Sequence, residues 1–230
     1  MIQSIVANKT YPDNKELEFY TDYLIKFDTI CSNLPEFALT LKPVEDFFNT
    51  IDATENEIIK SASHHPSWEW CSKLAGSDPV KMAKILGHIR FWPPQNNEIN
   101  SSTEKPRWAH SRAAVLMFCG LGTFNENYDW KQTDREPNSR LRSLVFDQIQ
   151  DLIIAGGKYQ KFFDYEKEKK LKLGTNEQNA HMAAKKATAI LFINHLWEIT
   201  RTNLDMEIYP IYHNLKPDRE EFHNPLNMID

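Results

Sequence analysis

Glycine is scarce in this sequence, and its scarcity narrows the choice of fold. The 230 residues include only seven glycines, about 3% against the ~7% that is usual in proteins. None of them belongs to a G-x-G-x-x-G or a G-x-x-x-x-G-K-[ST] pattern, so neither of these phosphate-binding loops is present. A chain with so few glycines also lacks the frequent turn signals of a β-sandwich.

Cysteines and long apolar runs are also few. Cys31, Cys71 and Cys119 are far apart and form no C-x-x-C pair, which favours free thiols in a reducing cytosol over a disulfide framework. The longest apolar run, residues 187–193, contains Thr188 and is much shorter than the ~20 residues of a membrane span. The first residues have neither the basic start nor the apolar core of a signal peptide. We therefore expect a cytoplasmic protein with no membrane segment.

Apolar residues recur at helical spacing along most of the chain, which predicts an all-α fold. The predicted helices cover residues 14–31, 43–51, 66–76, 79–92, 107–121, 139–155, 158–172 and 175–203, and a further one begins at Thr54. The last of them is apolar on most sides, from Ala183 to Trp197, and such a helix is buried. We expect one compact multi-helix bundle over residues 1–230, with this long C-terminal helix inside it. The alternative is two lobes, 1–92 and 107–230, hinged at the polar, proline-bounded segment 93–106.

Several helix starts carry capping signals. Thr54 and Glu57, like Thr175 and Gln178, have the spacing of a capping box, and Ser139 precedes a clear apolar stripe. In the segment SASHHPSWEWCSKLAG, residues 61–76, Pro66 suits the first position of a helix that Gly76 ends. The adjacent His64 and His65 diverge at such a helix entry and have no standard zinc spacing to other ligands. We predict that the protein holds no metal and no other cofactor.

Charge is unevenly distributed. The chain has a net charge of −5, but residues 105–186 carry 15 basic and 10 acidic side chains, a net charge of +5. Six arginines and tryptophans of this basic region are predicted to bind a partner: Arg107, Trp108, Arg112, Trp130, Arg140 and Arg142. Arginine beside aromatic rings suits contact with an acidic protein or with nucleic acid, whereas the overall acidity argues against non-specific duplex binding.

Individual residues of the basic region and the last helix also have structural interpretations. Arg112 begins a largely apolar stripe, so it either extends along the apolar surface to water or pairs with a buried carboxylate. His181 and His195 share one helix face but lie about 21 Å apart along the axis, too far to bind one metal. Both are expected to be histidines whose hydrogen bonds are satisfied inside the protein.

No combination of residues commits the chain to a reaction. The sequence has no H-E-x-x-H, no G-x-S-x-G and no paired E-x-x-H pattern. We therefore favour a cytosolic interaction protein, an adaptor, immunity or regulatory factor of bacterial or phage type, whose partner is a protein with an acidic surface. One alternative is an enzyme or enzyme subunit whose site is assembled from dispersed histidines and arginines. Another is a nucleic-acid-associated protein.

Overall fold

The protein is helical throughout its described part. A computed structural model describes residues 35–91, 111–122, 137–208, 221–222 and 224–229. These residues form seven α-helices and one 3-10 helix and contain no β-strand, which confirms the all-α prediction. The chain divides into two compact units, residues 1–55 and 56–230. The predicted helix 14–31 and the predicted hinge 93–106 lie outside the described residues and stay predictions.

Helix α3, Pro35–Ala62, corrects two predictions. The sequence predicted a short helix from Pro43 and a new start at Thr54, but both residues lie inside one continuous helix of 28 residues. The Thr54 hydroxyl donates to the carbonyl of Thr50 at 2.8 Å, and Thr50 bonds Asp46 in the same way at 2.7 Å. A threonine that bonds the carbonyl four residues back sits in a helix interior, not at a cap.

The stretch after α3 folds as turn, short helix, turn and helix. Helix α4, Trp68–Ser72, is shorter than the predicted helix 66–76, because it begins two residues after Pro66 and ends four residues before Gly76. Helix α5, Pro79–His88, begins at Pro79, as predicted. The Asp78 carboxylate accepts from the backbone N–H groups of Val80 and Lys81, which are donors without a partner inside the helix. α5 ends at His88, four residues before the predicted end, and it buries the predicted stripe: Met82, Ile85 and Leu86, with Ile89 just beyond.

Helices α7, Arg112–Phe118, and α8, Ser139–Ile154, both begin at a side-chain cap. Ser111 caps α7 by accepting from the N–H of Ala114 at 3.2 Å. Asn138, one residue before the predicted Ser139, caps α8 by accepting from Leu141 at 2.9 Å. The buried face of α8 matches the predicted apolar stripe at Leu141, Val145, Ile149, Leu152 and Ile153.

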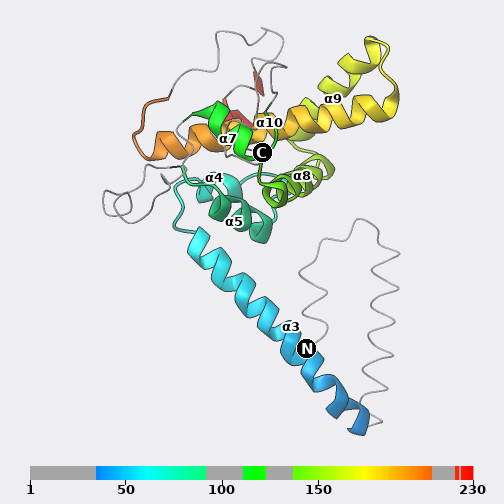
Figure 1. The fold of residues 1–230 in the computed structure, drawn as a ribbon, viewed down its shortest axis with the longest axis vertical. Helices are drawn as coiled ribbons and strands as arrows, with labels where there is room; N and C mark the ends of the chain where they lie inside the picture. Colours follow the sequence, from blue (N-terminus) through cyan, green and yellow to red (C-terminus); the bar gives the residue numbers. More distant parts are fainter. Residues whose placement is uncertain (1–34, 92–110, 123–136, 209–220, 223, 230) are drawn as a thin grey trace. The chain divides into compact units, whose positions relative to one another are not determined.

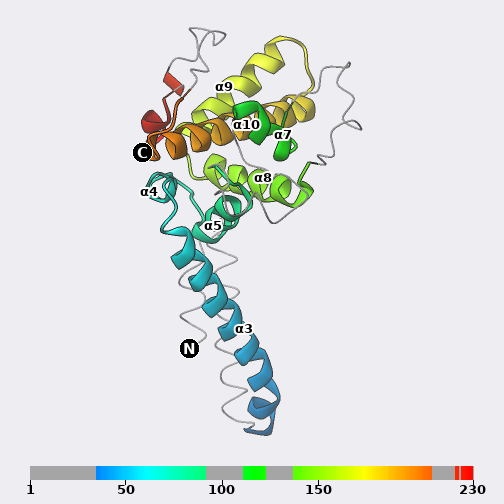
Figure 2. The ribbon, with the colours of Figure 1, turned by 60° about the vertical axis from the view of Figure 1, so that its left-hand side comes forward.

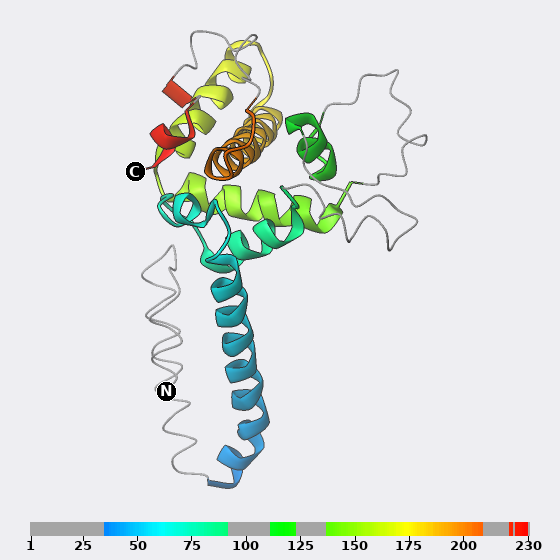
Figure 3. The same ribbon diagram turned by 90° about the vertical axis from the view of Figure 1, so that its left-hand side faces the viewer.

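Helices α9, Lys158–Lys172, and α10, Glu177–Asn203, form the largest packing interface of the second unit. The N-cap of α10 is Asn176 instead of the predicted Thr175, and its side chain accepts from Asn179. α10 has 27 residues, one fewer than α3, and it is the predicted long buried helix. Figures 1 and 3 show it between α9 and α7, with α8 on a third side. Twelve of its residues are buried, which places the core of this unit along α10.

The C-terminal residues close one end of this core. The 3-10 helix η4, Pro225–Met228, packs against α10, and the Trp70 indole donates to the Pro225 carbonyl at 2.9 Å. Phe222 packs edge to face on Phe162 of α9 with ring centroids 5.3 Å apart. Figure 2 shows η4 beside α9 and α10. Among the described helices, none is both long enough and apolar enough to cross a membrane.

Candidate functional site

Arg112 lies at the first position of α7 and joins that helix to α10. Its Nη2 donates to Glu198 Oε2 at 2.7 Å, and the two side chains are only 13% and 16% exposed. The Ser111 cap fixes the start of α7 and therefore the point from which the guanidinium leaves the backbone. Of the two structural interpretations, pairing with a buried carboxylate is the one observed. The assignment of Arg112 to a partner surface stays a prediction.

A second arginine meets the same part of α10. Trp197 is 1% exposed, and the guanidinium carbons of Arg112 and Arg201 lie 4.9 and 4.8 Å from the centroid of its ring system. Trp197 and Arg201 are four residues apart on α10, so they share one helix face. We call Arg112, Trp197, Glu198 and Arg201 the arginine–tryptophan cluster. An indole in contact with two guanidinium groups stabilises their charge through its π-electron face.

Arg140 and Arg142 lie in the first turn of α8, and both side chains are exposed. The Arg142 guanidinium carbon lies 5.7 Å from the centroid of the Phe146 ring, one turn along the helix. The first turn of a helix has unpaired N–H groups and a positive dipole end, so cations there are mildly destabilising. Together with Arg112, these two arginines are the described residues of the predicted partner surface.

The structure does not place the whole predicted set together. Arg107, Trp108 and Trp130 lie outside the described residues, so their assignment stays a prediction. Sequence reasoning also missed Arg201 and Glu198. Arg201 could have been found from its spacing to Trp197, because residues four positions apart on a helix lie side by side. The pairing of Glu198 with Arg112, 86 residues away, had no local signal.

His65 is partly buried and is hydrogen-bonded within the turn before α4. Its Nδ1 accepts from the backbone N–H of Ser67 at 3.2 Å, and its ring packs edge to face on Phe91. Among the described residues, no three His, Cys, Asp or Glu side chains gather closely enough to hold a metal ion. Burial lowers the pKa of His65 to about 4, so its imidazole is neutral at pH 7.

We expect His65 to make the protein less stable in acid. Its pKa in the folded state lies below the ~6.5 of an exposed histidine, so the unfolded chain takes up the proton first. The stability that the neutral ring contributes is then lost as pH falls from about 6.5 to about 4, by about 2 kcal/mol at pH 5. Urea unfolding of His65→Asn, whose side chain can still accept from Ser67, should therefore show a smaller loss between pH 7 and pH 5 than wild type.

The neighbouring His64 provides the control for this prediction. Its side chain is exposed, so His64→Asn removes one histidine without removing the buried one. The general loss of stability from carboxylate protonation is common to all three proteins and cancels in the comparison. Equal pH dependence in wild type and His65→Asn would contradict the prediction.

A second histidine, His195, lies inside the protein, as predicted. It is fully buried on α10, and its Nδ1 lies 2.9 Å from the Tyr159 hydroxyl of α9. The pKa of Tyr159 is raised well above its usual value, first by burial and then by Cys71. His181 packs edge to face on Phe163 with ring centroids 5.1 Å apart. The Tyr159–His195 pair thus ties α9 to α10 through one polar contact.

The two described cysteines are protonated thiols at neutral pH. Burial raises the pKa of Cys71 and of Cys119 to about 12. Both are free thiols in the hydrophobic core. Because a thiol must ionise to act as a nucleophile, neither is suited to that role at neutral pH.

Comparison with known proteins gives no relative from which a functional site could be transferred. No protein-family model matches the chain, and no curated protein and no solved structure shows a significant match to it.

Proposed function

We propose that this chain is a cytosolic interaction protein that binds a partner with an acidic surface. The observation that carries the proposal is the exposure of Arg140 and Arg142 together in the first turn of α8. A cation at that position destabilises the helix by about 0.3–1 kcal/mol. A contact with an anionic partner is a physical reason for two arginines to stand there.

The surroundings of the two arginines support the same proposal. They belong to residues 105–186, which carry a net charge of +5 in a chain of net charge −5. Arg142 is also next to an aromatic ring, Phe146, which is partly buried against the core. An arginine fork pairs with a carboxylate in two parallel hydrogen bonds, and an adjacent ring adds apolar contact area. Arg107, which lies outside the described residues, is proposed to extend this surface.

The test is the affinity of a charge-reversed variant for the partner. After a pull-down from the native host, binding of the recovered partner is measured for wild type and for the triple variant Arg107→Glu, Arg140→Glu, Arg142→Glu. We expect at least a tenfold loss of affinity in the variant, and in wild type a steep fall of affinity as salt is raised. Folding should be nearly unchanged, because exposed substitutions shift stability by about 0.5 kcal/mol each.

A matched variant separates this surface from a general charge effect. Lys42 and Lys60 are both exposed on α3, so Lys42→Glu with Lys60→Glu changes the net charge as much as the double variant Arg140→Glu, Arg142→Glu, which is measured beside the triple variant. The α3 pair should keep wild-type affinity. Equal affinities for wild type and the triple variant, with no salt dependence, would contradict the proposal that this surface binds the partner. If the recovered partner is a nucleic acid, the alternative of a nucleic-acid-associated protein is favoured.

A further inference from the structure

Arg201 is a buried cation with an unused hydrogen-bond donor. Only 5% of the residue is exposed, and its Nε donates to the Glu207 carbonyl at 2.7 Å. Within the part of the chain that the structure describes, its buried Nη1 has no hydrogen-bond partner. Burial of a polar group without a partner is destabilising, and more so when the group is charged.

The backbone after α10 contacts this guanidinium. The N–H of Met206 donates to the Arg201 carbonyl at 2.9 Å, which folds the chain back over the end of the helix. Asp205 makes that reversal with a φ of +51°, the left-handed region that residues other than glycine rarely adopt. The same reversal positions the Glu207 carbonyl that holds Nε. Arg201 is therefore held in one orientation by its own helix end.

Arg201 is one of two cations in the arginine–tryptophan cluster. Glu198 lies 2.7 Å from the guanidinium of Arg112, and both guanidinium groups contact the face of Trp197. An arginine stays protonated in proteins, so Arg201 keeps its charge although it is buried. The face of Trp197 offsets part of the cost of desolvating this cation. An anion beside Nη1 would offset more of that cost.

We propose that the arginine–tryptophan cluster is a binding site for a small oxyanion, a phosphate or a carboxylate group, which accepts a hydrogen bond from Arg201 Nη1. A guanidinium held by its Nε and by an aromatic face is preorganised for such a ligand, since little freedom is left to lose on binding. The site lies where α7 contacts α10 and involves residues other than Arg140 and Arg142. It therefore stands or falls separately from the proposed partner surface.

Thermal unfolding of the full chain in the presence of inorganic phosphate tests the proposal. Sodium chloride keeps the ionic strength constant, and a parallel titration with succinate supplies carboxylate groups. We expect the unfolding midpoint to rise and then level off as the site fills. At ten times the dissociation constant, the unfolding equilibrium should shift about elevenfold, which corresponds to about 3–5 °C for a chain of this size. A rise with succinate alone would support the site and identify carboxylate as its ligand.

Variants of the arginines identify the site. Arg201→Gln should abolish the rise, and Arg201→Lys should weaken it, because lysine keeps the charge without the planar fork. Arg140→Gln, which removes an exposed arginine of α8, should leave the rise unchanged. A midpoint that follows ionic strength alone, or an equal rise in folded Arg201→Gln, would overturn the proposal. If Arg201→Gln does not fold, the wild-type titrations still test the proposal. An unfolding midpoint that shows no saturable rise with phosphate or succinate would overturn it.

Discussion

Replacing Trp197 with alanine should lower the free energy of unfolding by about 3–5 kcal/mol, the range for a large buried aromatic residue. Trp197 is 1% exposed and lies in the core that α10 forms with its neighbouring helices. Its ring also contacts the guanidinium groups of Arg112 and Arg201. Alanine would thus leave a cavity and at the same time remove the aromatic face from two largely buried cations. Urea unfolding followed by circular dichroism measures the loss.

Two further substitutions separate the cavity from the cation contact. Trp197→Phe and Trp197→Leu both shrink the side chain, but only phenylalanine keeps a π-electron face for the arginines. We expect Phe to be the more stable of the two, by about 1 kcal/mol. Trp68→Ala is the control, because Trp68 is only partly buried against the same core and should cost less. A loss below about 1 kcal/mol in Trp197→Ala would show that α10 is not the centre of the core.

The helices that the sequence predicted well are those whose signals are local. The Asp78-Pro79 start of α5 and the stripe of α8 depend on residues within a few positions of each other, and both were found. The buried α10 was also predictable, since a helix apolar on most sides has to be covered. The helix start predicted at Thr54 was wrong for an equally local reason. Thr54 and Glu57 have the spacing of a capping box, but the same hydroxyl bonds a carbonyl inside a continuous helix.

The candidate site was less predictable, because its contacts join distant segments. Arg112 was singled out, and a buried carboxylate was one of its two expected structural environments. Which carboxylate it meets depends on how α7 packs on α10, and sequence spacing does not give that. Burial of His65 against Phe91 is a tertiary contact of the same kind. Chemistry that depends on burial, such as the low pKa of His65, therefore needs the fold before it can be inferred.

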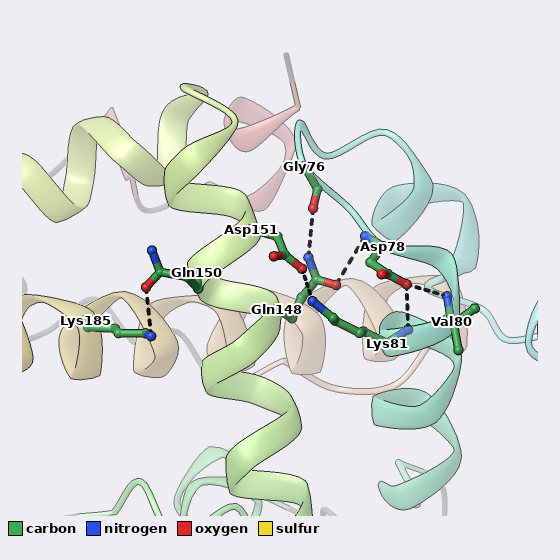
Figure 4. Close-up of polar contacts among 8 residues, drawn as sticks. All are labelled: Gly76, Asp78, Val80, Lys81, Gln148, Gln150, Asp151 and Lys185. Atoms are coloured by element: carbon green, nitrogen blue, oxygen red, sulfur yellow. Dashed lines mark hydrogen bonds and ion pairs between the residues drawn. The ribbon is translucent and has the colours of Figure 1, made fainter. Parts of the chain in front are cut away.

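Gly76 lies at a close approach between the turn after α4 and helix α8. Its φ is +76°, and a Cβ atom there would meet the Asp151 carbonyl oxygen at 2.5 Å and the Ala155 Cβ at 2.6 Å. Figure 4 shows how Gln148 fastens this contact: its amide donates to the Gly76 carbonyl at 3.0 Å and accepts from the N–H of Asp78 at 3.2 Å. An ion pair between Lys81 and Asp151 joins α5 to α8 beside it.

Gly76→Ala should therefore lower the free energy of unfolding by about 2–4 kcal/mol. The left-handed backbone contributes about 1 kcal/mol for any residue with a Cβ, and the overlap with backbone atoms of α8 adds about 1–3 kcal/mol. Gly174→Ala is a matched control, because Gly174 has a φ of +80° but no atom within 4 Å of the position a Cβ would take. That variant should lose only the backbone contribution, about 1 kcal/mol. Urea unfolding of both variants measures the difference, which is the cost of separating the turn from α8. Equal losses in the two variants would show that α8 does not approach Gly76 as closely as described.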